Sequence, residues 1–118
     1  MNNGIGKFKE RMSPLVDKWQ KELDVCAKRV IVQKMKTKWG SCTPQTQTIR
    51  INLELAKKPT ECLEYIIIHE LLHLIEPTHN DHFKYLINKY IPNWKYYRDE
   101  LNKLPVRHES WIYKNGHG

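Results

Sequence analysis

The sequence contains no long run of apolar residues. Its longest candidate, 65–68, is interrupted at once by His69 and Glu70, whereas a membrane-spanning helix needs roughly 20 apolar residues. Residues 1–9 also lack the apolar core of a secretory signal peptide. These two absences argue against a membrane protein and against secretion.

Cysteine is also scarce. The three cysteines, Cys26, Cys42 and Cys62, form no Cys-x-x-Cys pair, and an odd number cannot close a framework of disulfides. This pattern is typical of a protein in the reduced cytoplasm, so we expect a cytoplasmic location. We expect the three thiols to be buried or half-buried structural groups rather than zinc ligands.

Internal repeats and low-complexity segments are absent, and the chain is too short for two ordinary domains. It has 118 residues, of which 40% are hydrophobic and 28% charged. That balance is typical of globular proteins and not of disordered ones. The sequence therefore predicts a single domain over residues 1–118, with its core at about 13–104 and a tail at 105–118.

Positive charge is in excess. Lysine and arginine total 20 against 13 acidic residues, which gives a net charge of +7. Such an excess fits either a solvated basic surface or an acidic partner, of which nucleic acid is the commonest. Because the basic residues are spread along the whole chain, composition does not choose between these two interpretations, and it says nothing of the oligomeric state.

The first half of the chain predicts one helix and then strands. Ser13 and Pro14 form a helix start, with serine as the N-cap. Apolar residues then recur at helical spacing toward Lys28: Leu15, Trp19, Leu23 and Cys26. Strands are expected at about 30–35, 39–42 and 49–53, the last two pairing across a turn at 43–45. In the last strand apolar residues alternate with the polar Arg50 and Asn52.

The second half predicts helices. One begins at Pro59 and stops before Pro77, a second spans about 80–90 with Asn80 or Asp81 as its cap, and a third spans about 94–104. A helix, a small and mostly antiparallel sheet, and then further helices indicate an α+β domain.

The decisive motif is HExxH, formed by residues 69–73 inside the most apolar predicted helix. Residues four apart lie one turn above each other, so His69 and His73 can share one metal. Neutral imidazole suits Zn²⁺, which a catalytic site holds through three protein ligands and a water. Glu70 lies about 100° round the helix, from where its carboxylate reaches that water. We therefore expect a catalytic zinc site with Glu70 as general base.

The third ligand must come from beyond this helix. Glu76 has the right azimuth but lies roughly 10 Å along the helix from His69. Glu100, on a later helix, and His82, near a helix start, are alternatives. His79 lies on the turn after the helix, completes the spacing HExxHxxxxxH, and is the expected ligand. Metzincins share that spacing but have glycine in the place of Glu76 and a methionine downstream, which this chain lacks.

A second motif, Trp39-Gly40-Ser41-Cys42, precedes the last expected strand. Its simplest interpretation is a core or rim aromatic followed by a bend or a close backbone approach at the glycine. The functional interpretation is a wall or strand edge beside the zinc, since an open strand edge can hold an extended peptide as an added strand.

Several motifs together resemble the YgjP-like metallopeptidases, which are zincins related to the SprT and WLM proteases. They follow one another in order: residues 36–42, residues 51–55, Tyr65, residues 69–74, His79 with Phe83, and Pro92 with Trp94. The resemblance implies a minimal zincin fold, a zinc ion held by His69, His73 and His79, and Glu70 as the catalytic carboxylate. Lys84 departs from the family, which usually has an aromatic residue there.

The sequence thus predicts a zinc metallopeptidase that acts on peptides or proteins. One alternative is a nucleic-acid-associated module with a vestigial or structural zinc site, and another is a zinc hydrolase with a non-peptide substrate. A structural zinc site is closed by four protein ligands, whereas this motif supplies three and a general base. No residue stands out as the group that stabilises the oxyanion formed during hydrolysis. Tyr96, Tyr97 and Arg107 are weak candidates for that role.

Overall fold

The structure is a computed structural model in which residues 4–103 are described. Helices flank three strands in this order: α1 (Gly4–Leu23), β1 (Arg29–Gln33), β2 (Gly40–Thr43), β3 (Thr48–Asn52), the 3₁₀ helix η1 (Leu53–Lys57), α2 (Thr60–Leu72), α3 (Asp81–Tyr90) and α4 (Trp94–Asn102). This order confirms the α+β class. None of the described helices has the length and apolar character needed to cross a bilayer. The tail expected at 105–118 lies outside the described residues.

The sheet is mixed rather than mostly antiparallel. Its strand order is β1-β3-β2. β2 and β3 form the expected antiparallel hairpin, with Gly40 opposite Ile51, but β1 pairs with β3 in parallel, Val30 beside Ile49. The alternation of apolar residues gives each strand its buried face and says nothing of its direction, so the parallel pair could not be inferred from sequence.

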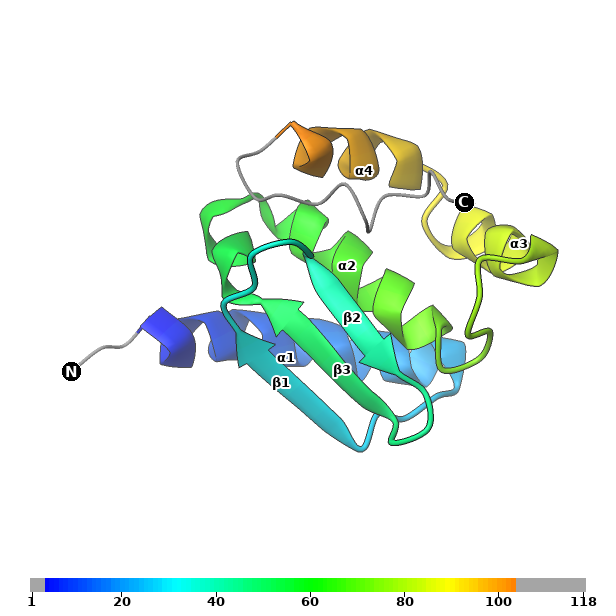
Figure 1. The fold of residues 1–118 in the computed structure, drawn as a ribbon, viewed down its shortest axis with the longest axis horizontal. Coiled ribbons are helices and arrows are strands. Elements are labelled where there is room, and N and C mark those ends of the chain that lie inside the picture. The colour runs from blue at the N-terminus through cyan, green and yellow to red at the C-terminus, as the bar shows by residue number, and fades with distance from the viewer. Residues whose placement is uncertain (1–3, 104–118) are drawn as a thin grey trace.

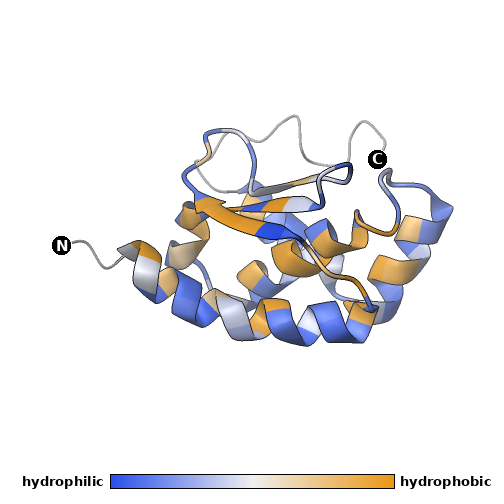
Figure 2. Cartoon of the chain, turned by 90° about the horizontal axis from the view of Figure 1, so that it is seen from below, coloured by the Kyte–Doolittle hydropathy of each residue, from blue (hydrophilic) through white to orange (hydrophobic). Residues whose placement is uncertain are grey.

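Helix α2 lies at the centre of the molecule. It packs against α1 on one side and against β2 and β3 on the other, and it also contacts α3 and α4. Figures 1 and 2 show the resulting layers, with the sheet and α1 on opposite sides of α2. Ten of its thirteen residues are buried, which is why its sequence is apolar all round instead of on one face. The HExxH motif is therefore carried by the most enclosed of the described helices.

Helix α1 begins earlier than the sequence predicts. It includes residues 4–12, and Pro14 lies inside it rather than at its start. Proline in a helix interior costs about 3 kcal/mol. The extra turns bury Phe8 and Met12, and each such side chain contributes about 1.5–3 kcal/mol when buried, which offsets that cost. The core thus extends to the N-terminal side of residue 13.

Helix α1 also ends earlier than expected, at Leu23 instead of near Lys28. Asp24 has a φ of 55°, and Val25 N–H donates to the Gln20 carbonyl at 3.0 Å. A left-handed residue with this hydrogen bond closes a helix. Cys26 then lies outside the helix and is exposed, so the expectation that all three thiols are buried or half-buried fails there.

The later helices begin where the sequence predicts, but α2 ends at Leu72 instead of continuing to Pro77. The N–H groups of residues 73–75 donate to carbonyls three residues back, which tightens the chain out of the α-helix. α2 begins directly after Pro59, and α4 begins at Trp94. The Asn80 side chain caps α3, because its Oδ1 accepts a hydrogen bond from the Phe83 N–H at 2.9 Å. The residues between Leu72 and Asp81 form a connection without helix or strand, and this connection carries His79.

Candidate metal centre

Three histidines meet at the C-terminal end of α2. His69 and His73 lie one helical turn apart, and both are buried. His79 approaches them from the α2–α3 connection, with its Nε2 at 3.1 Å from Nε2 of His69 and at 3.1 Å from Nε2 of His73. The three histidines form a group whose ligand atoms all lie within 4.8 Å of one another.

This triangle of nitrogens fits a tetrahedral metal ion. Zn–N distances of about 2.0–2.1 Å place the ligand nitrogens of a tetrahedral site about 3.3–3.4 Å apart, close to the 3.1 Å that separates Nε2 of His79 from Nε2 of each of the other two histidines. Three ligands leave a fourth position for water. The sequence predicted that these three histidines share one metal ion, and the structure brings their side chains together.

The other ring nitrogens are already engaged. Nδ1 of His73 donates to the backbone carbonyl of Glu76 at 2.9 Å, and Nδ1 of His69 lies 2.9 Å from Oε2 of Glu70. With a proton on Nδ1, a neutral imidazole presents the lone pair of Nε2, which is the atom that faces the triangle. Burial lowers the pKa of His69 to about 3 and, with the neighbouring His69, also lowers that of His73, which favours the neutral form that binds metals.

Phe83 supports all three histidine rings from α3. Its ring stacks on His73 with centroids 4.6 Å apart, and it meets the edges of His79 at 4.8 Å and of His69 at 5.3 Å. In the sequence, Phe83 stood out only as part of the family pattern. One aromatic side chain therefore couples the packing of α3 to the shape of the metal centre.

Glu70 is buried beside the three histidines, with 3% of its surface exposed. Burial raises the pKa of its carboxyl to about 7, although the charges of His73 and Lys38 oppose this shift. A carboxylate with a pKa near neutrality can both accept and release a proton at physiological pH. The sequence predicted this residue as the general base, and its surroundings suit that role.

Strand β2 reaches the active helix at Gly40. A Cβ at this position would lie 2.8 Å from Cγ2 of Ile66, 3.1 Å from Cγ of Glu70 and 3.2 Å from the Arg50 carbonyl. Gly40 is therefore needed for space. Within the described residues β2 is an outer strand of the sheet, with a neighbour only on its β3 side. The glycine of the Trp39–Cys42 motif thus marks the close approach, and the strand that it begins packs against α2 beside Glu70.

Cys42, two residues further along β2, is half-buried. Burial raises the pKa of its thiol to about 12, and the negative charge of Glu70 acts in the same direction. The thiol therefore stays protonated near neutral pH, and it is not a member of the metal-ligating group. This agrees with the expectation of a structural cysteine.

Asn52 holds the segment that leads into β2, and its importance was missed. It is fully buried, whereas the alternation in its strand grouped it with the polar residues. Its Nδ2 donates to the carbonyls of Met35 at 3.0 Å and Lys38 at 2.7 Å, while its Oδ1 accepts from the N–H of Met35 and Glu54. In the sequence, Asn52 stood out only as part of the family motif at residues 51–55.

Glu76 and His82, which the sequence offered as other possible ligands, are not grouped with the three histidines. The Glu76 carboxylate accepts hydrogen bonds from Asn80 at 2.7 Å and from His82 at 2.8 Å, and these bonds lower its pKa. His82 is a half-exposed residue of the first turn of α3, as the sequence predicted. Neither Glu76 nor His82 joins the metal-ligating group.

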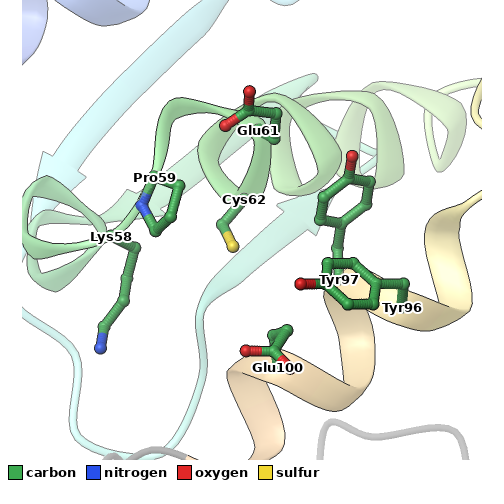
Figure 3. Close-up of a pocket in the computed structure, with 7 residues that line it drawn as sticks. All are labelled: Lys58, Pro59, Glu61, Cys62, Tyr96, Tyr97 and Glu100. Atoms are coloured by element: carbon green, nitrogen blue, oxygen red, sulfur yellow. The ribbon is translucent and has the colours of Figure 1, made fainter.

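Glu100 lies at the other end of α2. It lines a cavity of about 390 Å³ together with Lys58, Pro59, Glu61, Cys62, Tyr96 and Tyr97, shown in Figure 3. Its carboxylate pairs with Lys103 at 3.0 Å. The structure thus separates Glu100 from the histidines.

The tyrosines suggested for the oxyanion lie in the same cavity. Tyr97 stacks on the buried Tyr65 with ring centroids 6.4 Å apart, and Tyr96 is 62% exposed. Of these three tyrosines Tyr65 approaches the histidines, at 6.0 Å between its ring centroid and that of His69. Arg107 lies outside the described residues.

Comparison with known proteins agrees with this geometry. The pattern of the family described as "YgjP-like, metallopeptidase domain" matches residues 5–104. The fold is similar to the crystal structure of the metallopeptidase zymogen of Pyrococcus abyssi, abylysin, with a TM-score of 0.73 and 23% identity over 82% of this chain and 98% of that one. It is also similar to the crystal structure of the metallopeptidase zymogen of Methanocaldococcus jannaschii, jannalysin. That comparison has a TM-score of 0.68 and 22% identity, and it covers 78% of this chain and 94% of that one.

A search of curated proteins finds no similar sequence, and at the identities above the two crystal structures support the fold alone. The family pattern is different, because it extends over most of the chain and includes every residue of the histidine centre. The chain therefore belongs to the YgjP-like family of metallopeptidase domains.

Proposed function

We propose that this protein is a zinc-dependent peptidase in which His69, His73 and His79 hold the metal and Glu70 is the general base. The observation that carries the proposal is the triangle of three Nε2 atoms beside a buried carboxylate. Three imidazoles suit zinc better than magnesium or calcium, which prefer oxygen ligands. A set of three protein ligands is also typical of catalytic rather than structural zinc sites.

When bound, zinc supplies a Lewis acid that polarises the scissile carbonyl and lowers the pKa of water at the open position toward 7. The carboxylate of Glu70 takes a proton from the attacking water and delivers it to the leaving amine. Its pKa of about 7 suits both transfers. The hydrogen bond from His73 Nδ1 to the Glu76 carbonyl holds that ring with Nε2 toward the metal position.

The substrate is proposed to be an extended segment of a peptide or protein that adds to β2. This strand lies at the edge of the described sheet and begins where Gly40 touches Glu70. Backbone N–H and C=O groups of an edge strand can hold a peptide without reading its side chains. Such an arrangement would place the scissile bond next to the general base.

Metal analysis of purified variants tests the ligand set. We expect one zinc per chain in the wild type and in the controls His82→Ala and Glu100→Ala, and loss of zinc in His79→Ala. Full zinc occupancy in His79→Ala would remove His79 from the site. Glu70→Gln should keep the zinc but lower the hydrolysis of an unfolded protein substrate by roughly 10²–10⁴-fold; equal rates would remove Glu70 from the mechanism.

A further inference from the structure

The α2–α3 connection has to present His79 at one point in space, although it contains no helix or strand. A ligand on such a segment is well placed only if neighbouring groups fix the backbone on both sides of it. Three side-chain hydrogen bonds in and around the connection involve one residue, Glu76, which lies three residues after His73 and three before His79.

The backbone of Glu76 fixes the first half of the connection. Its N–H donates to the Leu72 carbonyl at 2.8 Å, which ties the connection to the last residue of α2. Its carbonyl accepts the hydrogen bond from Nδ1 of His73 at 2.9 Å. The position of this peptide group therefore determines how the imidazole of His73 is turned.

The side chain of Glu76 fixes the second half. Oε1 accepts from Nδ2 of Asn80 at 2.7 Å, and Oε2 accepts from Nδ1 of His82 at 2.8 Å. Asn80 directly follows His79, and it also caps α3 through Phe83. The two oxygens thus hold the start of α3, and with it the backbone that bears His79. Hydrogen bonds to a carboxylate are short and about twice as strong as neutral ones.

We propose that Glu76 is the positioning residue of the metal centre, because it connects the orientation of His73 to the placement of His79 before a metal binds. The inference rests on the proposed function, since it concerns the same three histidines. Groups that orient metal ligands without touching the metal typically change metal affinity by 10–100-fold. Without the carboxylate, metal binding itself would have to order the α2–α3 connection. The free energy needed for that ordering would reduce the affinity for the metal.

Cobalt(II) titration tests this proposal without relying on activity, because the visible absorption of Co²⁺ reports both its affinity and the symmetry of its ligands. For Glu76→Ala we expect binding about 10–100-fold weaker than wild type and a changed visible spectrum. Glu76→Gln keeps one acceptor oxygen, so its affinity for Co²⁺ should lie between those of the wild type and Glu76→Ala. Glu100→Ala removes another glutamate with a hydrogen-bonded partner, far from the histidines, and should bind Co²⁺ like the wild type.

His82 provides a second pair of variants in case Glu76→Ala does not fold. An asparagine at position 82 places its side-chain N–H₂ near the position of the imidazole Nδ1 and can still donate to Glu76. His82→Asn should therefore bind Co²⁺ more tightly than His82→Ala, while both retain one metal per chain. Equal affinities of these two variants and the wild type would contradict a role for this hydrogen bond.

The outcomes separate the two proposals. A wild-type protein that binds no Co²⁺ or Zn²⁺ overturns the proposed function and this inference with it. Tight wild-type binding together with unchanged affinity and spectrum in Glu76→Ala overturns the inference alone. A loss of affinity shared equally by Glu100→Ala, or one that leaves the visible spectrum unchanged, also overturns it, since either result indicates a general loss of stability.

Discussion

The close contact at Gly40 makes a sharp prediction about the substitution Gly40→Ala. The added Cβ would lie 2.8 Å from Cγ2 of Ile66 and 3.1 Å from Cγ of Glu70. Ile66 is fully buried and cannot move without displacing its own neighbours. The third contact, at 3.2 Å, is with the carbonyl of Arg50, which belongs to the β-ladder. Strand β2 must therefore move away from α2, or the Glu70 side chain must change its conformation.

The magnitude follows from this crowding. Inserting one methyl group into a packed interior typically costs about 1–3 kcal/mol. In a domain of roughly 100 residues, 1 kcal/mol lowers the melting temperature by about 4–8 °C. We therefore expect the melting temperature of Gly40→Ala to lie at least several degrees below that of the wild type. The loss of folded protein at 25 °C is small, and hydrolysis should fall by more than that loss explains. The reason is that the added methyl group contacts Cγ of Glu70, the proposed general base.

Gly6→Ala is the matched control. Gly6 lies in α1, and unlike at Gly40 no atom lies within 4 Å of a Cβ placed there. Since alanine favours a helix more than glycine by up to about 1 kcal/mol, Gly6→Ala should be neutral or stabilising. Thermal melts and peptidase assays of both variants give the comparison. A Gly40→Ala protein that melts and hydrolyses like the wild type would refute the close approach of β2 to Glu70.

Four further predictions concern stability and partners. Asn52→Leu leaves buried backbone groups without partners, so the urea midpoint should fall by the equivalent of about 1–3 kcal/mol. Pro14→Ala should raise the melting temperature, because proline costs about 3 kcal/mol in a helix interior; no gain would favour a helix start at Ser13. Removing metal with a chelator should lower the melting temperature, and zinc at 100 times its Kd should restore about 2.7 kcal/mol. DNA binding measured by fluorescence anisotropy should weaken steeply with salt, and no binding at low salt would refute a nucleic-acid partner.

The grouping of the three histidines with Glu70 could be predicted because their spacing is local. His69, Glu70 and His73 lie within two turns of one helix, and helical geometry alone brings their side chains together. His79 follows after a short connection, which limits how far its ring can lie from the other two. The boundaries of α3 and α4 were predictable for the same reason, since a capping asparagine and a proline mark them locally.

Features that depend on long-range packing could not be predicted. The apolar pattern of β1 is satisfied equally by a parallel and an antiparallel neighbour, so the mixed sheet had no signal in the sequence. Pro14 read as a helix start, yet the burial of Phe8 and Met12 against the rest of the core extends α1 past it. Asn52 looked like a solvent-facing residue because its partners lie 14 and 17 positions away along the chain.

Among residues 4–103, no strand pairs with the outer edge of β2, and this has a consequence for the behaviour of the protein in concentrated solution. An unpaired strand edge accepts any extended chain, including that of a second copy of the same protein. Two features limit this: the strand has only four residues, and the exposed Lys36 and Lys38 precede it, which adds repulsion between like-charged copies. A copy paired at this edge would occupy the position proposed for the substrate. Self-association through β2 and loss of activity would then be one event, and activity per molecule would fall as the protein is concentrated.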